Sequence, residues 1–206
     1  MRLLLVRHGA TTWNVQARYQ GHQDVPLSAQ GQVESEYLAE RLTGEAVAAI
    51  YSSDLIRAQE TAEIIATRLG KAVNLEPRLR EIRMGEWQGL TYEEVRRRHF
   101  NISDPLPCYA IDQPPAGGET LRQVQVRVME AFREITARHS EIDKCVLLVT
   151  HGACLRALTC SWLGIELHAY WKLAFASGSV SEVFVSPAGA VLTRLNDTSH
   201  LRARRR

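Results

Sequence analysis

Residues 3–14 read LLLVRHGATTWN, an apolar run that stops abruptly at Arg7, His8 and Gly9. The apolar part, Leu3 to Val6, is too short to span a membrane but fits a strand that is buried on both faces of a parallel sheet. In open α/β sheets, ligands bind beyond the carboxyl ends of the strands, where loops carry the chemistry. We therefore expect a functional site directly after this first strand.

The three residues at the break offer different chemistry to a ligand. The Arg7 guanidinium has fixed donors for an oxyanion, and the His8 imidazole can act as a nucleophile or a base near neutral pH. Gly9 lets the backbone turn tightly and approach a ligand closely. The alternative interpretation is a strand end with a solvated arginine and a hydrogen-bonded histidine.

Length and charge limit the classes of protein to which the chain can belong. Its 206 residues are 45% hydrophobic and 23% charged, which predicts one domain over residues 1–206 with a cap-like insertion at 76–117. A net charge of +2 is too small to indicate nucleic acid or a membrane as a partner. The basic C-terminus fits a solvated tail better than a nucleic-acid site; it contains Arg202, Arg204, Arg205 and Arg206.

Cysteine usage and the N-terminus predict a cytoplasmic protein. The cysteines have neither CxxC spacing nor a metal-ligand pattern, so we expect reduced and mostly buried thiols. They are Cys108, Cys145, Cys154 and Cys160. The first residues lack the length and cleavage site of a signal peptide, and no stretch is long enough for a membrane-spanning helix.

Strand and helix patterns alternate along the chain, which predicts an α/β fold: a three-layer α/β/α sandwich with a mostly parallel central sheet. The expected strands are 3–6, 46–51, 72–75 and 145–150, followed by a closing hairpin of 180–185 and 191–195. The expected helices are 28–42, 55–69, a long one from 120, and an apolar one that ends at 163.

Local signals place the helix starts and an irregular lobe. Residues 52–54 offer cap residues for the helix that follows them, and capping boxes are expected at Thr91 and Thr120. The segment 76–117 holds five prolines, Pro77, Pro105, Pro107, Pro114 and Pro115. We expect it to form a small irregular lobe over the site, not an independent domain.

Two strands of this pattern end alike. Residues 5–9 read LVRHG and residues 148–152 read LVTHG. Central strands of one parallel sheet release their carboxyl ends at the same edge, so His8 and His151 are expected to converge.

Two further segments supply charged candidates. Arg57 lies in the first turn of a helix that follows a strand, where unpaired N–H groups and the helix dipole favour anions, so an arginine there suggests an anionic ligand. Glu81 and Glu86 lie in a glycine-punctuated aromatic loop, and either can be a proton donor. The alternatives are a solvated arginine and two surface glutamates.

The chain resembles the histidine phosphatase superfamily, also called the phosphoglycerate mutase-like family, over nearly its whole length. The family's Arg-His-Gly signature matches residues 7–9, and further family patterns follow in the family's order. They are TxxN at 11–14, RxxG at 18–21, PLSxxG at 26–31, SxxxxRAxxTA at 52–62, ExxxG at 81–85, GGE at 117–119 and THG at 150–152. One departure is Ala10, where many members carry glutamate.

The resemblance implies a role for each matching residue. His8 is the implied nucleophile that becomes phosphohistidine, and Glu81, which precedes the glycine turn, is implied as general acid in preference to Glu86. The phosphoryl oxygens are expected to be held by Arg7, Arg57 and His151, helped by Asn14, Gln20, Gly21 and Gly152. No metal or cofactor is expected, because two guanidiniums and a second histidine can supply the positive charge.

These roles predict a metal-independent phosphomonoesterase acting on a small phosphorylated metabolite. One alternative is a cofactor-dependent phosphoglycerate mutase, although the segment after the acid is shorter than the cover that usually seals a mutase site from water. Another is a non-catalytic phosphate-binding module. Members of the family often form dimers, so a homodimer is also expected, without a pattern that fixes the stoichiometry.

Substrate candidates include phosphoserine, α-ribazole phosphate or a broad range of phosphomonoesters. Residues 195–201 are similar to the ending of the metal-independent phosphoserine phosphatases, whereas Met84 stands where those enzymes carry a substrate-binding histidine. The expected specificity pocket consists of Arg83, Met84, Trp87, Tyr109 and His200. Ordinary packing or a solvated loop is the alternative for each of them.

Overall fold

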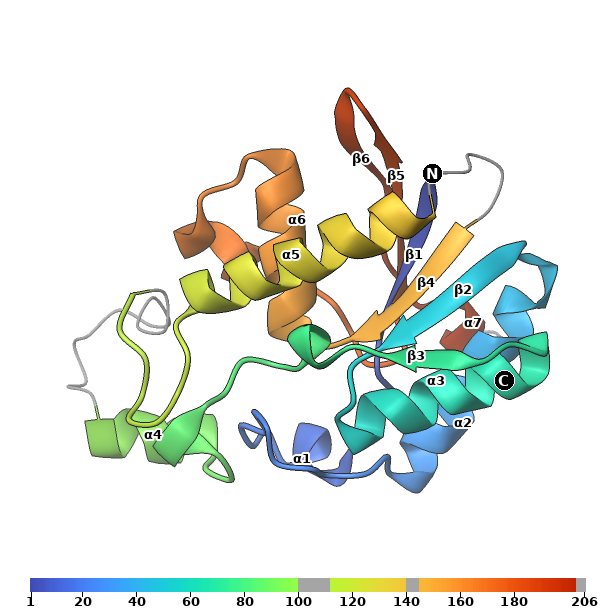
Figure 1. The fold of residues 1–206 in the computed structure, drawn as a ribbon. Coiled ribbons are helices and arrows are strands. Elements are labelled where there is room, and N and C mark those ends of the chain that lie inside the picture. The colour runs from blue at the N-terminus through green and yellow to red at the C-terminus, as the bar shows by residue number, and fades with distance from the viewer. Residues whose placement is uncertain (100–111, 140–144, 203–206) are drawn as a thin grey trace.

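The computed structural model describes residues 1–99, 112–139 and 145–202. A six-stranded sheet with the order β3-β2-β4-β1-β5-β6 forms its centre (Figure 1). The strands are β1 (Arg2–Arg7), β2 (Val47–Ser52), β3 (Val73–Leu75), β4 (Cys145–Thr150), β5 (Val180–Ser186) and β6 (Gly189–Asp197). The first four in the sheet order are parallel, and β5 and β6 form an antiparallel hairpin at the edge. The predicted mostly parallel sheet with a closing hairpin is confirmed.

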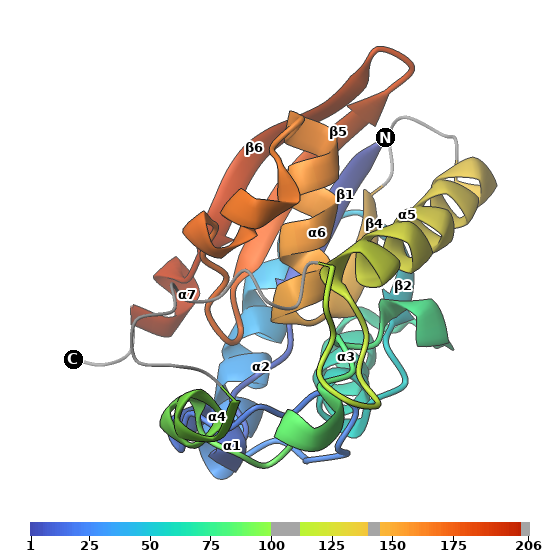
Figure 2. The same cartoon turned by 90° about the vertical axis from the view of Figure 1, so that its left-hand side faces the viewer.

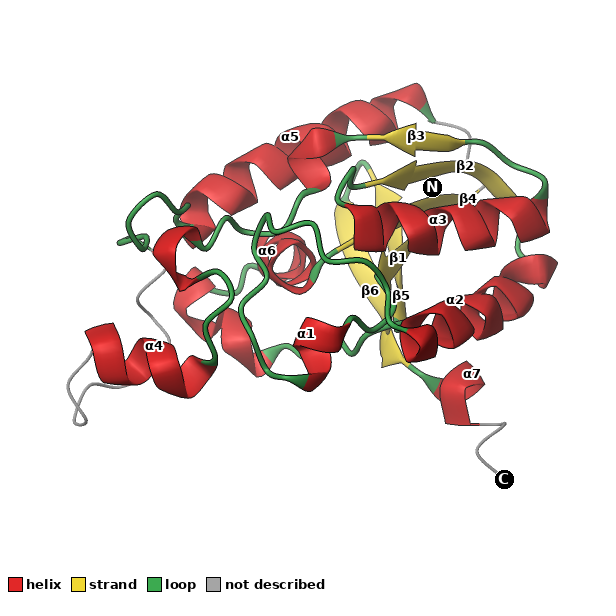
Figure 3. Ribbon diagram, turned by 90° about the horizontal axis from the view of Figure 1, so that it is seen from below, coloured by secondary structure: helices red, strands yellow, loops and turns green. Residues whose placement is uncertain are grey.

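Helices cover both faces of the sheet, as the apolar first strand requires. Leu4 and Val6 of β1 pack in one apolar core, whereas Leu3 and Leu5 pack in the other. The first core lies under α2 (Ala29–Arg41) and α3 (Ile56–Leu69), and the second under α5 (Leu121–Arg138) and α6 (Gly152–Leu163). Figure 3 shows these two helix pairs on opposite sides of the strands, so the three-layer prediction is confirmed.

The two central strands end side by side. Arg7 at the end of β1 pairs in register with Thr150 at the end of β4. The backbone N–H of His8 continues this ladder by donating to the carbonyl oxygen of Thr150 at 3.1 Å. The predicted convergence of the two strand ends is confirmed.

Loops and short helices gather beyond these strand ends. The short helices α1 (Thr12–Val15) and α4 (Tyr92–His99) overlap in the view of Figure 2 but lie apart in Figure 1, while α7 (Ser199–Arg202) lies near the C-terminus. Backbone hydrogen bonds from Tyr19 to Leu90 (2.9 Å) and from Gly89 to Tyr19 (2.8 Å) join the loop after α1 to residues of the 76–117 segment. The two segments therefore form one cover over the edge of the sheet.

The structure confirms most of the predicted helix starts and corrects one. Thr120 and Gln123 form a reciprocal capping box, and so do Thr91 and Glu94. In contrast, residues 52–54 do not cap α3, because its N-cap is Leu55. The hydroxyl of Ser53 instead accepts from the Leu55 N–H at 3.2 Å and lies 2.9 Å from Nε2 of His151.

The structure shows a close approach of Gly9 to helix α2. A Cβ on Gly9 would collide with the carbonyl oxygen of Gly31, and a Cβ on Gly31 with that of Ala10. The hydroxyl of Ser28 donates to the same Ala10 carbonyl at 3.0 Å. Two glycines thus let the loop after β1 pack directly on the first turn of α2, which fixes the position of His8.

Other predictions concern burial and the termini. Cys145, Cys154 and Cys160 are free and buried, as predicted. Cys108, Tyr109 and the last four residues, 203–206, lie outside the described residues. No helix within the described ranges has both the length and the apolar character needed to cross a membrane.

Candidate active site

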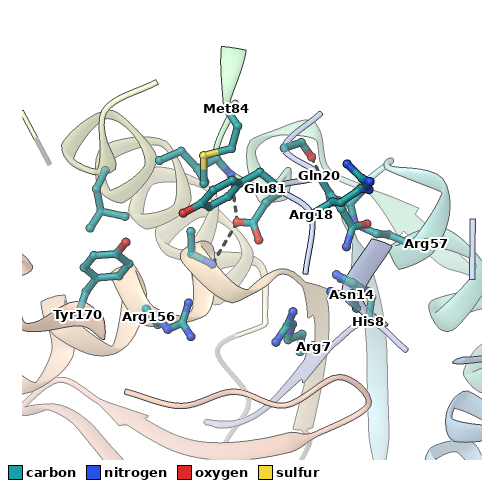
Figure 4. A pocket seen from close by; sticks show the side chains of 15 residues that line it. Arg7, His8, Asn14, Arg18, Gln20, Arg57, Glu81, Met84, Arg156 and Tyr170 are labelled. Carbon is teal, nitrogen blue, oxygen red and sulfur yellow. Dashed lines mark hydrogen bonds between the residues drawn. The ribbon is translucent and has the colours of Figure 1, made fainter. Parts of the chain in front are cut away.

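A cavity of about 210 Å³ opens beyond the carboxyl ends of β1 and β4 (Figure 4). Of the site residues predicted from the sequence, those that line it are Arg7, His8, Asn14, Gln20, Gly21, Arg57, Glu81 and Met84. They come from segments far apart in the chain, which the parallel sheet brings to one edge.

His8 is held in place by burial and by a contact with the backbone. Its side chain is buried, and Nδ1 lies 2.7 Å from the carbonyl oxygen of Gly9. Because a carbonyl oxygen only accepts, Nδ1 carries the proton in the neutral ring and Nε2 keeps its lone pair. Burial, with added repulsion from Arg57 and Arg7, holds the pKa of His8 well below its ordinary value. The neutral form of the ring is therefore favoured.

His151 lies against His8, with the two ring centroids 5.1 Å apart. It is fully buried, and its Nε2 is 2.9 Å from the hydroxyl of Ser53, while Nδ1 has no partner in the described part of the chain. Burial and the neighbouring Arg57 and His8 hold the pKa of His151 well below its ordinary value as well. His151 is thus not part of the cavity lining but lies directly behind its reactive centre.

Two buried guanidiniums carry the positive charge of the site. Arg57 has no exposed surface and donates to the carbonyl oxygens of Gly21 (2.9 Å) and Gln23 (3.0 Å). Arg7 donates from Nη1 to the carbonyl oxygen of Phe175 at 2.5 Å. Within the described residues, neither arginine forms an ion pair, and Nε of each has no partner.

Such charges are costly without a counterion. Burial lowers the pKa of Arg57 to about 10 and lowers the pKa of Arg7 in the same direction, since desolvation disfavours the charged forms. An uncompensated buried ion costs several kcal/mol, and a bound anion removes that cost. Arg7 and Arg57 therefore favour binding of an oxyanion in this part of the cavity.

Asn14, Gln20 and Gly21 complete this end of the cavity. The amide oxygen of Asn14 accepts from the N–H and the hydroxyl of Thr11, at 2.9 and 3.0 Å, which leaves its Nδ2 group for a ligand. The amide oxygen of Gln20 is buried without a protein partner among the described residues. Gly21 has a left-handed φ of +55° and presents its carbonyl oxygen to Arg57.

Glu81 reaches the cavity from the opposite wall. One carboxylate oxygen, Oε1, accepts from the backbone N–H groups of Ile82 and Ala153, both at 3.0 Å, as the dashed lines in Figure 4 show. The other oxygen is left for a ligand. Glu86 is exposed and does not line the cavity. The structure therefore places Glu81, and not Glu86, where a proton can pass to a bound group.

Several predicted residues lie away from the cavity lining. Gly152 is buried beside the Arg7 guanidinium, whereas the Arg83 side chain is exposed and its backbone N–H donates to Glu119 at 2.8 Å. Trp87 is buried, and His200 bonds through Nε2 to the carbonyl oxygen of Gly178 at 2.9 Å. The specificity pocket expected from the sequence is thus reduced to Met84 among the described residues.

The cavity also contains residues that the sequence analysis did not select. They are Arg18, Tyr19, Ile82, Leu121, Ala153, Arg156 and Tyr170. A signal existed for Arg156, because it is the one charged residue in the sequence of helix α6. Tyr170 lies in a short 3-10 helix, Leu167–Lys172, and no sequence pattern marks it.

Within the described ranges, no three His, Cys, Asp or Glu side chains cluster as ligands of one ion. The positive charge available at the cavity is that of arginine side chains.

Comparison with known proteins places this site in a family. The family model for the histidine phosphatase superfamily, branch 1, matches residues 3–198. The chain belongs to this superfamily. The predicted family and the predicted phosphatase type are thereby confirmed.

Individual histidine phosphatases are similar over almost the full chain. Phosphoserine phosphatase 1 of Hydrogenobacter thermophilus is 35% identical, over 98% of this chain and 94% of its own. A probable phosphoglycerate mutase, GpmB, of Photorhabdus laumondii is also 35% identical, over 98% and 95%. A mycobacterial glucosyl-3-phosphoglycerate phosphatase, solved with VO3, superposes with a TM-score of 0.86 and 31% identity, over 96% of this chain and 99% of its own.

Proposed function

We propose that this histidine phosphatase hydrolyses small phosphomonoesters in two steps, without a metal ion, through a phosphohistidine at His8. The observation that carries the proposal is the buried His8 imidazole, whose pKa is held well below its ordinary value, beside two buried arginines without a counterion among the described residues. Arg7, Arg57 and His8 line the same cavity, so a phosphate group bound by the arginines would be near the His8 ring. This arrangement supports a role for His8 as the nucleophile.

In the first step, Nε2 of His8 attacks phosphorus and the bond to the ester oxygen breaks. The leaving oxygen takes a proton from Glu81, so an alcohol departs and the phosphoryl group stays on the ring. In the second step, Glu81 takes a proton from water, whose oxygen attacks phosphorus as the P–N bond breaks. Inorganic phosphate leaves, and His8 and Glu81 return to their starting states.

Fixed positive charge lowers the barrier of both steps. The equatorial oxygens of the transferring group gain charge that Arg7, Arg57 and the Asn14 amide stabilise, each donor contributing on the order of 3 kcal/mol. His151, which packs on His8, adds to this stabilisation of the transferring group through a proton on its own ring. Ser53 orients that ring by its 2.9 Å contact.

A phosphoglycerate mutase is the second candidate, because relatives such as the Photorhabdus protein are named so. A mutase must keep water from the phosphohistidine, which the short segment between Gly89 and Gly117 disfavours. Supplying 2,3-bisphosphoglycerate with 3-phosphoglycerate tests for it: appearance of 2-phosphoglycerate at a rate above phosphate release indicates a mutase. A protein that binds phosphate esters but forms neither product would instead be a non-catalytic binding module.

The substrate we propose is a small phosphorylated metabolite. The names of the relatives, phosphoserine phosphatase and glucosyl-3-phosphoglycerate phosphatase, support this class, and α-ribazole phosphate stays a candidate. A panel of phosphorylated metabolites assayed with excess chelator tests both the class and the metal independence. Loss of all phosphate release on chelation would contradict the proposal. A homodimer and a cytoplasmic location stay predictions.

A further inference from the structure

The cavity has a second cationic end that the phosphate chemistry does not use. Figure 4 shows Arg156 and Tyr170 at one end, while His8, Asn14 and Arg57 lie at the other, with Glu81 between them. In the proposed function Glu81 protonates the leaving oxygen, so the leaving group starts beside Glu81, and Arg156 lies on the side of Glu81 away from His8 and Arg57. The residue at this end therefore meets the part of the substrate that distinguishes one ester from another.

Arg156 is held in place by its surroundings. Its Nε donates to the carbonyl oxygen of Leu173 at 2.8 Å, and its Cζ lies 5.9 Å from the centre of the Tyr170 ring. These two contacts orient the planar guanidinium and leave the Nη groups toward the cavity. A side chain fixed in this way loses little conformational freedom when it binds a ligand.

This arginine also has no negative partner in the part of the chain that the structure describes. Arg18 also lines the cavity, but it has a negative partner, because its Nη1 lies 3.4 Å from the Glu94 carboxylate. Arg156 is thus the cation at this end of the cavity whose charge is not already paired.

The distance between the two cationic ends suits a short molecule. A Cβ built on Gly152 would lie 3.5 Å from Nη1 of Arg156 and 3.8 Å from Cζ of Arg7. Both guanidiniums therefore lie within 4 Å of one point. A phosphate at Arg7 and an anionic group at Arg156 need only a short carbon chain between them. Ile82, Met84 and Leu121 provide an apolar lining for that chain.

We propose that Arg156 binds a carboxylate on the leaving group, so that the substrates are phosphate esters of short hydroxy acids or amino acids. The proposal rests on the proposed function, since it concerns the leaving group of that reaction. The two Nη groups of a guanidinium match the two oxygens of a carboxylate. The cavity of about 210 Å³ has room for one phosphate and a small acid.

The test compares two substrates that differ only at the proposed contact. 3-Phosphoglycerate carries a carboxylate where glycerol 3-phosphate carries a hydroxymethyl group. The unaltered protein is expected to prefer the acid in kcat/KM by about 10- to 100-fold, as one charged hydrogen-bonded pair allows. Arg156→Gln is expected to remove that preference mainly through KM, and Arg156→Lys to keep part of it. Arg133→Gln, an exposed site on α5, is the matched control and should leave the preference unchanged.

Three results would overturn the proposal. The first is that the unaltered protein shows no preference for the acid. The second is that the preference survives in Arg156→Gln. The third is that Arg156→Gln loses kcat/KM equally for both substrates, which would assign Arg156 to the phosphate. Thermal melting checks folding, and Arg156→Lys decides if the glutamine variant does not fold. Hydrolysis of p-nitrophenyl phosphate by the unaltered protein separates the proposed phosphatase reaction from the proposed carboxylate site. If this hydrolysis proceeds through phosphohistidine but no acid is preferred, only the carboxylate site is refuted.

Discussion

The carboxylate of Glu81 accepts a 3.0 Å hydrogen bond from the backbone N–H of Ala153, in the first turn of helix α6. That helix begins one residue after His151, so the bond connects the acid loop to the strand end beside His8. The Arg127 guanidinium fixes the same loop from behind, donating to the carbonyl oxygens of Arg80 (2.7 Å) and Glu81 (2.9 Å). Glu81 and His8 thus have fixed positions relative to each other.

Replacing Glu81 is expected to affect substrates according to their leaving groups. Glu81→Gln keeps the shape of the side chain but cannot supply a proton, so esters of alkyl alcohols should slow by about 10²- to 10⁴-fold. p-Nitrophenyl phosphate, whose leaving group needs no proton, should slow far less in its first step. Single-turnover rates for both substrates measure the difference.

The matched control for this experiment is Glu86→Gln, since Glu86 is exposed and outside the cavity lining. Its rates should equal those of the unaltered protein. Equal losses for both leaving groups in Glu81→Gln would show that Glu81 is not the proton donor.

Adding one methyl group to Gly31 is expected to disturb the loop that carries His8. A Cβ there would collide with the carbonyl oxygen of Ala10, and overpacking of this kind costs about 1 to 3 kcal/mol. Urea unfolding measures the loss for Gly31→Ala. Gly44→Ala is the control, because a Cβ on Gly44 has no atom within 4 Å. A Gly31→Ala protein as stable and active as this control would refute the packing argument.

The buried histidines predict a loss of stability in mild acid. The folded-state pKa of His8 and that of His151 lie well below the ordinary value of 6.5, so the unfolded chain binds protons first as the pH falls. Stability is therefore complete above pH 6.5 and is lost below it, by up to about 1.4 kcal/mol per pH unit for each histidine.

Urea unfolding between pH 7 and 5, in buffers without phosphate, measures this slope. His8→Asn should reduce it, whereas the exposed His168→Asn should not. A slope that is unchanged in His8→Asn would mean that the pKa of His8 is the same in the folded and the unfolded protein.

Inorganic phosphate is expected to stabilise the fold, because it neutralises Arg7 and Arg57. At a phosphate concentration one hundred times its Kd, the gain is about 2.7 kcal/mol, visible as a rise in Tm. Arg57→Gln should abolish the rise, while the exposed Arg133→Gln should keep it. A rise of equal size in Arg57→Gln would place the anion elsewhere.

Local patterns and strand periodicity predicted the sheet, its helices and the meeting of the two histidines. They did so because the buried strands are short apolar runs and because parallel strands share an edge. Features that depend on tertiary contacts were not predicted: Ser53 was expected to cap a helix and instead contacts His151, and the packing of Gly9 on Gly31 has no local pattern. Tyr170 could not be predicted, since only folding brings its 3-10 helix to the cavity.

The most direct test of the central claim is to trap the covalent intermediate. The protein is mixed with a phosphate ester, quenched in alkali within one turnover, and analysed by mass spectrometry of its peptides. We expect one phosphoryl group on the peptide that contains His8, and none in His8→Asn, whose turnover is also lost. A phosphoryl group on another residue, or phosphate release by His8→Asn at the rate of the unaltered protein, would contradict the account.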